Sequence, residues 1–148
     1  MLRDQADPDD QPIPRPVGAG LVARIVAALL AALVPIFLTL NQVTADGVQA
    51  KGWDTYQRTD WIVLIFAVLM IVTLAASYAS GSPALPAAAV GLGFAMFGIV
   101  IVFPLEQLAA SSDSQLEIGG TLTILAAFAS GLAALVAAAA DGAQSRLR

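Results

Sequence analysis

The chain has 148 residues, of which 58% are hydrophobic and only 12% are charged, and its mean hydropathy is +0.80. Ordinary soluble domains are about 45–50% apolar and about 25% charged, so this composition excludes a conventional soluble core. The chain contains no Cys and no His, which excludes disulfides, thiolate chemistry and the commonest general base and metal ligand. The net charge of −4, without any cluster of Lys and Arg, argues against binding to nucleic acid.

The first segment, residues 1–19, carries four Asp and four Pro and has no apolar run. Such a segment buries too little surface to offset the entropy of ordering it, so we predict a disordered tail. Within this tail, the stretch Pro12–Pro16 favours the polyproline II conformation.

Four apolar runs follow, at about 21–40, 61–78, 85–103 and 119–140. Each is long enough to cross a bilayer, which takes about 17–25 apolar residues. Short connections between consecutive runs favour antiparallel neighbours, so residues 20–140 predict an all-α membrane protein, an antiparallel bundle of four transmembrane helices. Residues 141–148 are predicted to be a tail.

Three prolines in or next to these runs are expected to shape the helices. Pro35 is expected to kink the first helix, Pro86 suits the first turn of the third, and Pro104 is expected to end the third. The first run also has an alternative interpretation as a cleaved signal sequence, because Val43-Thr44-Ala45 has acceptable spacing for cleavage. The acidic leading segment and the length of the run favour a retained helix.

Basic residues near the helix ends predict the orientation. Five lie on the side that holds both termini and the short turn at Gly81, and two lie on the opposite side. The positive-inside rule therefore places both termini in the cytoplasm and the protein in the cytoplasmic (inner) membrane, crossing it several times. The five are Arg3, Arg15, Arg24, Arg146 and Arg148, and the two are Lys51 and Arg58.

Ionisable side chains within the spans are the usual sites of coupling in transporters. Only Arg24 qualifies, and it lies near a helix end, where its long stem is expected to extend to the headgroups. In the external connections, Asp113 and Glu117 are four residues apart, but a solvated loop explains them. We therefore predict no enzyme activity and no catalytic, cofactor-binding or metal site, and we expect no cofactor.

Small residues recur at helical spacing in the last two runs, and in lipid such rows let two helices approach closely. They are interpreted as packing positions within the bundle or, alternatively, as a docking face for a larger membrane protein or a second copy. The candidate residues are Gly91, Ala95, Ala127, Ser130, Gly131 and Ala134.

The long connection Asn41–Trp61 is the most aromatic polar segment. If residues 48–58 are helical, Trp53 and Trp61 fall on one face with Tyr56 beside them, and Asp54 and Arg58 form an i,i+4 pair. This predicts a short interfacial helix in the first external loop, with Trp53, Tyr56, Arg58 and Trp61 as candidate contacts for a partner or lipid. An aromatic anchor at headgroup level is the alternative.

The order of these features resembles that of small four-helix integral membrane proteins of actinobacteria, most of which lack a characterised activity. The likeness rests on Gly52-Trp53-Asp54 in the first external loop, on Asp60 just before the second span, and on the Gly-initiated last span Gly119–Ala140. It implies the architecture and the membrane compartment, and it implies no catalytic residues.

These observations lead to three functional hypotheses. The first is a non-enzymatic accessory or stabilising subunit of a larger cell-envelope complex, for which a lipid or solute transporter is one plausible host, with membrane lipids around it. The second is a small oligomeric transporter in its own right that uses external carboxylates such as Asp60 or Glu106. The third is an envelope lipid-binding or sensor protein that uses the face from Trp53 to Trp61.

Overall fold

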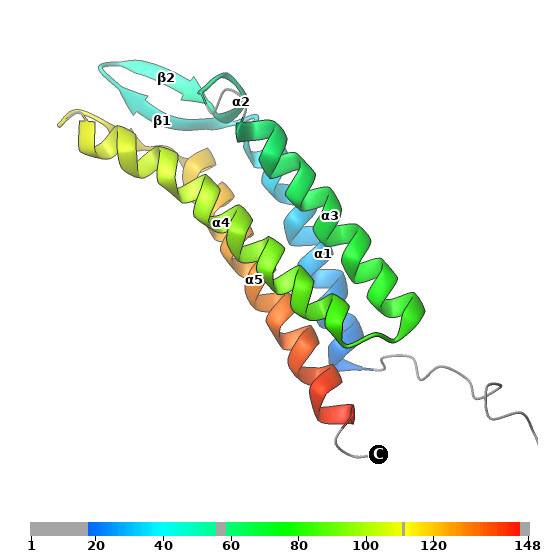
Figure 1. Cartoon of the computed structure of the whole chain (residues 1–148). Coiled ribbons are helices and arrows are strands. Elements are labelled where there is room, and N and C mark those ends of the chain that lie inside the picture. Colours follow the sequence, from blue (N-terminus) through cyan, green and yellow to red (C-terminus); the bar gives the residue numbers. More distant parts are fainter. Residues whose placement is uncertain (1–17, 56–58, 111, 146–148) are drawn as a thin grey trace, which may run out of the picture.

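A computed structural model describes residues 18–55, 59–110 and 112–145. Within these residues, four helices are long and apolar enough to cross a membrane (Figure 1). They are α1 (Ala19–Phe37), α3 (Thr59–Ser80), α4 (Ala84–Ala110) and α5 (Ile118–Ser145). The predicted N-terminal tail lies outside the described residues except for Gly18 and Ala19.

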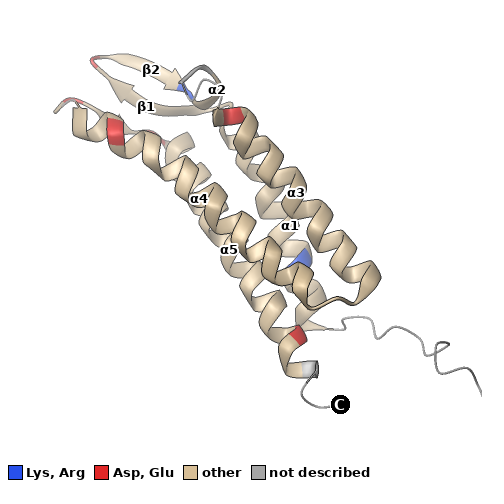
Figure 2. Cartoon of the chain, viewed as in Figure 1, with Lys and Arg blue, Asp and Glu red and all other residues tan. Residues whose placement is uncertain are grey.

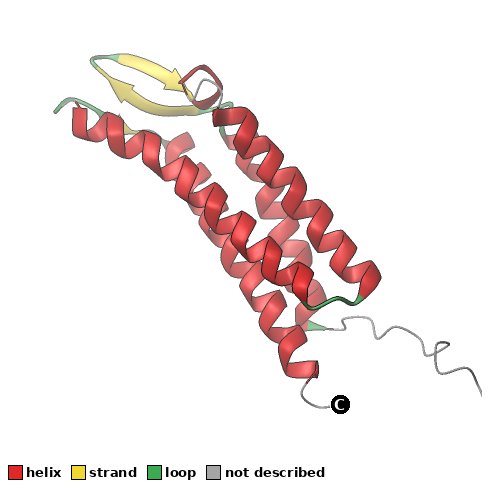
Figure 3. Cartoon of the chain, viewed as in Figure 1, coloured by secondary structure: helices red, strands yellow, loops and turns green. Residues whose placement is uncertain are grey.

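The four helices form an antiparallel bundle in which each helix packs mainly against two neighbours. α1 and α4 each pack against both α3 and α5, which gives the order α1-α3-α4-α5 around the bundle (Figure 1). The predicted all-α bundle of four apolar helices is therefore the fold. Figure 3 shows that strands occur only at one end, which we call the sheet end, and we call the opposite end the Arg24 end.

Buried positions along α3 and α4, and along α1 from Arg24 onward, recur in steps of three and four residues, which is the spacing of a seam between helices packed at a small angle. Large aliphatic side chains cover most of the outer surface of α1, α3 and α5 instead, as hydrocarbon requires. The buried seams comprise Ala27, Ala31, Val34 and Leu38 after the start of α1, Val63, Ala67, Met70 and Leu74 on α3, and Ala89, Gly93, Met96 and Val100 on α4.

Two predicted helix ends are wrong. α4 continues through Pro104 to Ala110 and does not stop before the proline, and α5 continues past Ala140 to Ser145. A proline removes only one backbone donor, and a membrane helix tolerates it where neighbouring groups pack around it. Pro104 is fully buried in this way. Pro35 likewise lies inside α1, two residues before its end.

The first connection folds as a β-hairpin followed by a short helix, α2 (Gly52–Thr55). β1 (Asn41–Ala45) pairs with β2 (Val48–Lys51), and β3 (Gln115–Leu116) from the other connection adds to β1, giving the antiparallel order β2-β1-β3. The helix expected over residues 48–58 is thus a strand up to Lys51 and helical only from Gly52 to Thr55, and residues 56–58 lie outside the described part.

The hairpin has a local cause. Ala45 pairs with Val48, which leaves Asp46 and Gly47 as a two-residue loop with φ of 52° and 76°. Two consecutive positive φ angles define the turn whose twist matches the flanking strands, and Asp-Gly is one of its preferred sequences. The Asp46-Gly47 pair was therefore the signal in the sequence that the helical interpretation overlooked.

α4 and α5 approach each other closely at Gly93 and Gly131. A Cβ atom added to Gly93 would lie 2.7 Å from the Cα atom and 3.0 Å from the amide nitrogen of Gly131. Backbone atoms cannot move aside as a flexible side chain can, so only glycine fits at this crossing. The ring of Phe128 packs beside it, with centroids 6.1 Å from Phe94 and 5.1 Å from Phe97.

We predict that Gly93→Ala destabilises the bundle by about 1–3 kcal/mol, because the added methyl group overpacks the crossing. Gly91→Ala is the matched control, since a Cβ atom there meets nothing within 4 Å. This control should leave stability unchanged or raise it by up to about 1 kcal/mol, as expected when alanine replaces glycine in a helix. Unfolding by dodecyl sulfate in mixed micelles measures both, and equal behaviour of the two variants would contradict the assigned crossing.

Candidate functional site

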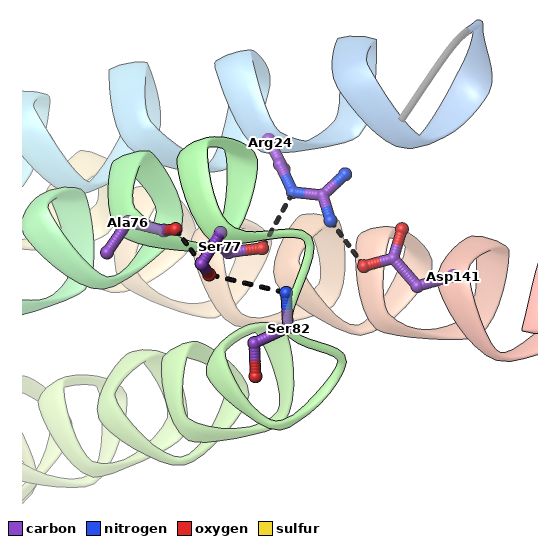
Figure 4. A network of polar contacts seen from close by, with 6 residues as sticks. Arg24, Ala76, Ser77, Ser82 and Asp141 are labelled. Atoms are coloured by element: carbon purple, nitrogen blue, oxygen red, sulfur yellow. Dashed lines mark hydrogen bonds and ion pairs between the residues drawn. The ribbon is translucent and has the colours of Figure 1, made fainter. Parts of the chain in front are cut away.

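A buried ion pair lies at the Arg24 end (Figure 4). The Nε atom of Arg24, on α1, donates a hydrogen bond of 3.1 Å to Oγ of Ser77 on α3, and Nη2 forms an ion pair with Oδ2 of Asp141 on α5. The side chains of Arg24 and Asp141 are only 5% and 15% exposed. One guanidinium group thus connects three of the four helices.

The structure corrects two expectations here. Arg24 does not extend outward to the headgroups but points into the bundle, and Asp141 belongs to α5, not to a tail. Gly20 lies beside the pair, and a Cβ atom there would make ordinary van der Waals contacts, 3.5 Å from Nη1 of Arg24 and 3.4 Å from Cβ of Ala140. Asp141 directly follows the last apolar run, so the sequence indicates that it lies near a helix end, as Arg24 does. The two residues are 117 positions apart, however, and no local sequence pattern predicts that they pair.

The pairing has a clear energetic reason. A charged side chain inside a membrane helix costs about 2.5–3.5 kcal/mol even on the lowest scale, and pairing with an opposite charge removes most of that cost. Figure 2 shows that acidic and basic residues of the described part lie towards the two ends, leaving the middle of the helices without charge. The ion pair therefore serves as a connection between helix ends and provides no charged path across the bundle.

The sheet end satisfies the backbone groups at the end of α1. The last carbonyl groups of a helix lack partners within it. Here Nε1 of Trp53 donates to the carbonyl oxygen of Pro35 at 3.2 Å, and Nε2 of Gln42 donates to the carbonyl oxygens of Phe37 at 2.8 Å and Leu40 at 3.1 Å. The hairpin and α2 are therefore fastened onto the helix, because their side chains cap it.

The same hairpin joins the second external connection. The amide of Glu117 donates to the carbonyl oxygen of Gln42 at 2.9 Å, and Oγ1 of Thr44 donates to Oε1 of Glu117 at 2.6 Å. At Gly120, an added Cβ atom would lie 2.6 Å from the carbonyl oxygen of Gln42, and one added at Gly119 would lie closer still to the carbonyl oxygen of Asn41. Glu117 was expected to be a solvated loop residue, but it anchors one connection to the other.

The predicted contact residues are only partly brought together. Trp53 and Trp61 pack edge to face, with ring centroids 5.9 Å apart and planes at 74°. Trp53 is half-buried against the core and engaged with Pro35, whereas Trp61 is 61% exposed. Tyr56 and Arg58 lie outside the described residues. The available surface of this pair therefore belongs mainly to Trp61.

The small residues of the last two runs divide between the interior and the surface. Ala127, Ser130, Gly131 and Ala134 of α5 are buried in the bundle, and Oγ of Ser130 donates to the carbonyl oxygen of Ala127 at 2.8 Å. Gly91 and Ala95 of α4 are exposed, on the outer face of that helix. Internal packing therefore accounts for the α5 residues, and it leaves the α4 pair unexplained.

Asp60 is the remaining buried ionisable residue that the sequence singled out. It is the second residue of α3, a position at which the positive end of the helix dipole stabilises a negative charge, and it is 2% exposed. Its Oδ1 atom has no hydrogen-bond partner within the described residues, and the same holds for Oε1 of Gln42. The described residues contain no group of three or more side chains able to hold a metal ion.

No protein family model, curated protein or solved structure matches this chain.

We predict that Arg24→Met destabilises the protein by about 3 kcal/mol, because it leaves the carboxylate of Asp141 buried without its partner. The double variant Arg24→Met with Asp141→Asn should recover most of this loss, since no uncompensated charge remains. Unfolding of wild type, both single variants and the double variant gives the coupling energy of the pair. Additive losses would mean that the two residues act independently.

Proposed function

We propose that this protein is a non-enzymatic accessory or stabilising subunit of a larger cell-envelope complex, and that the outer face of α4 docks against a transmembrane helix of the partner. One observation carries the proposal: the described part of α4 before Val102 exposes no large apolar side chain. Its exposed positions there are all alanine or glycine, whereas α1, α3 and α5 expose many large aliphatic side chains along their length. The exposed positions are Ala84, Ala87, Ala88, Gly91 and Ala95.

Physical chemistry explains why this contrast favours a partner helix. Lipid chains adapt to any apolar surface, so contact with lipid alone gives no reason for one helix to lack bulky side chains. A second helix gains from a flat surface, because association in lipid depends on close packing of backbones. Ala87, Gly91 and Ala95 are spaced four residues apart along one line of α4. Inside the bundle, small residues at Gly93 and Gly131 likewise let two helices approach closely.

The positions of the buried polar groups support a subunit over a transporter. Transporters place their substrate and coupling sites near the middle of the membrane. Among the described residues, the buried ionisable groups are Asp60, at the second position of α3, and the Arg24–Asp141 pair at the opposite end. Between these ends, the buried polar groups include Ser130, which bonds back to its own helix.

We also propose the cytoplasmic membrane as the location, with both termini in the cytoplasm. Arg24 is neutralised by Asp141, so the charge bias rests on the four remaining arginines near the termini against Lys51 and Arg58. The hairpin and the sheet end then face outward from the cytoplasm.

Single cysteines test this orientation cleanly, because the chain has none of its own. We predict that Val48→Cys, at a hairpin position that is 69% exposed, reacts with a membrane-impermeant maleimide in intact cells. Ser82→Cys, in the turn between α3 and α4, should react only after permeabilisation. The reverse labelling would place the sheet end in the cytoplasm.

Purification of the tagged chain in mild detergent tests the proposed partner. We predict co-purification in fixed stoichiometry with a larger membrane protein, and a loss of about tenfold in its recovery for Ala95→Leu, equivalent to about 1.4 kcal/mol. Ala76→Leu is the control, because it adds the same bulk at an exposed position on α3.

Recovery of only the 15.2 kDa chain contradicts the proposal. Equal recovery with both leucine variants would show that the partner binds elsewhere. Self-association lost only in Ala95→Leu would assign the α4 face to a second copy of this chain and would likewise overturn the accessory role.

A further inference from the structure

The exposed apolar surface of α1, α3 and α5 ends at one level, next to the sheet. Near that end of each helix, an exposed large apolar side chain has a polar residue as its direct neighbour in the chain. The three pairs are Leu40-Asn41, Asp60-Trp61 and Glu117-Ile118. The amide of Glu117 donates to the carbonyl oxygen of Gln42, which ties the first pair to the third. Trp61 packs on Trp53, whose Nε1 atom donates to Pro35 of α1, so the second pair lies beside them.

On α3, an amphipathic aromatic side chain lies at each end of this exposed surface. Trp61 and Tyr78 are both exposed and are 17 residues apart, which corresponds to about 26 Å along the helix axis. Tryptophan and tyrosine favour the boundary between hydrocarbon and headgroups, because the ring and its polar atom suit different surroundings. The two rings therefore mark the edges of an apolar belt. The large side chains exposed between them are all aliphatic: Ile62, Ile65, Val68, Leu69 and Val72.

The apolar belt has nearly the same height on the other two helices. The exposed large side chains run from Ile118 to Val136 on α5 and from Val22 to Leu40 on α1. Each stretch advances by 18 residues, about 27 Å at the helical rise. The outer face of α4 is the proposed contact with a partner, so it does not report on lipid.

Polar structure lies at each edge of the belt. Arg24 donates to Ser77, the chain neighbour of Tyr78, so the ion pair of Arg24 with Asp141 lies level with the edge at the Arg24 end. At the sheet end, β1 and β2 run across the ends of the helices and not along them (Figure 1). A sheet in this orientation lies parallel to the surface of the membrane.

The height of the belt has a consequence for the lipid around it. The hydrocarbon core of a typical bilayer is about 30 Å thick, and mismatch between this thickness and the apolar surface of a protein costs free energy. Tilt of the helices lowers the height of the belt further. We propose that the belt fits a bilayer whose hydrocarbon core is about 25 Å thick, which has shorter acyl chains than a typical bilayer, and that the β-sheet lies among the lipid headgroups. This inference concerns α1, α3 and α5 and does not depend on the proposed partner of α4.

Nitroxide labels on single cysteines locate the edges of the belt, since the chain has no cysteine of its own. Leu69 lies near the midpoint between Trp61 and Tyr78. Ile62 and Ala76 are seven residues away from Leu69 in opposite directions, and all three are exposed. In dipalmitoleoylphosphatidylcholine, power saturation should find the label of Leu69→Cys deepest, and those of Ile62→Cys and Ala76→Cys equally shallow, about 10 Å nearer the two surfaces. A label at Ala76 clearly deeper than one at Ile62 would show that hydrocarbon extends past Tyr78, which would overturn the assigned belt.

The same measurement tests the position of the sheet. A label on Val48→Cys, in the exposed part of the hairpin, should lie at the depth of the headgroups. If this label is as accessible to a water-soluble nickel complex as a free nitroxide is, the sheet projects into water and its proposed position is wrong.

Competition between lipids tests the thickness. A fluorophore on Leu69→Cys, quenched by a brominated phosphatidylcholine, reports how well an unbrominated lipid displaces the quencher from the belt. Dipalmitoleoylphosphatidylcholine should compete at least about threefold more strongly than dierucoylphosphatidylcholine, whose longer chains exceed the belt. Equal competition by the two lipids, or stronger competition by the longer one, would overturn the proposed fit.

Discussion

Hydrocarbon offers no hydrogen bonds, so a polar group that these helices bury costs free energy unless it finds a partner within the protein or in a lipid headgroup. This constraint explains both ends of the bundle. At the sheet end, the side chains of Trp53 and Gln42 donate hydrogen bonds to carbonyl oxygens at the end of α1. At the other end, Arg24 donates a hydrogen bond to Ser77 and forms an ion pair with Asp141, and its Nη1 atom has no hydrogen-bond partner within the described residues.

The connections outside the bundle are consequently part of its stability. The β-hairpin caps α1, and through Glu117 and the close contacts at Gly119 and Gly120 it also fixes the start of α5. Because these side chains bind other parts of the protein, the hairpin has less exposed surface for recognition than its composition suggests. Of the two described aromatic residues of this segment, Trp61 is the more exposed, and it lies at the end of the bundle where a membrane surface is expected.

Small residues lie on two faces of α4. On its inner face, Gly93 allows a close crossing with α5 at Gly131. On its outer face, Gly91 and Ala95 make a flat surface that no other described residue covers. The proposed accessory function rests on this second surface, because a face without bulky side chains lets the backbone of a partner helix approach closely in lipid.

The sequence by itself determined the bundle, because the length and apolarity of each run are local properties that decide whether a helix spans a membrane. The Asp46-Gly47 pair in the sequence also indicates the hairpin, although the aromatic spacing around Trp53 favoured a helix. Only the tertiary structure decided that Arg24 pairs with Asp141 and that Gly131 meets Gly93 while Gly91 faces outward. These are contacts between distant segments, and they depend on how each helix is rotated about its axis. Because α4 carries small residues on two faces, its sequence does not determine which of these faces packs against α5.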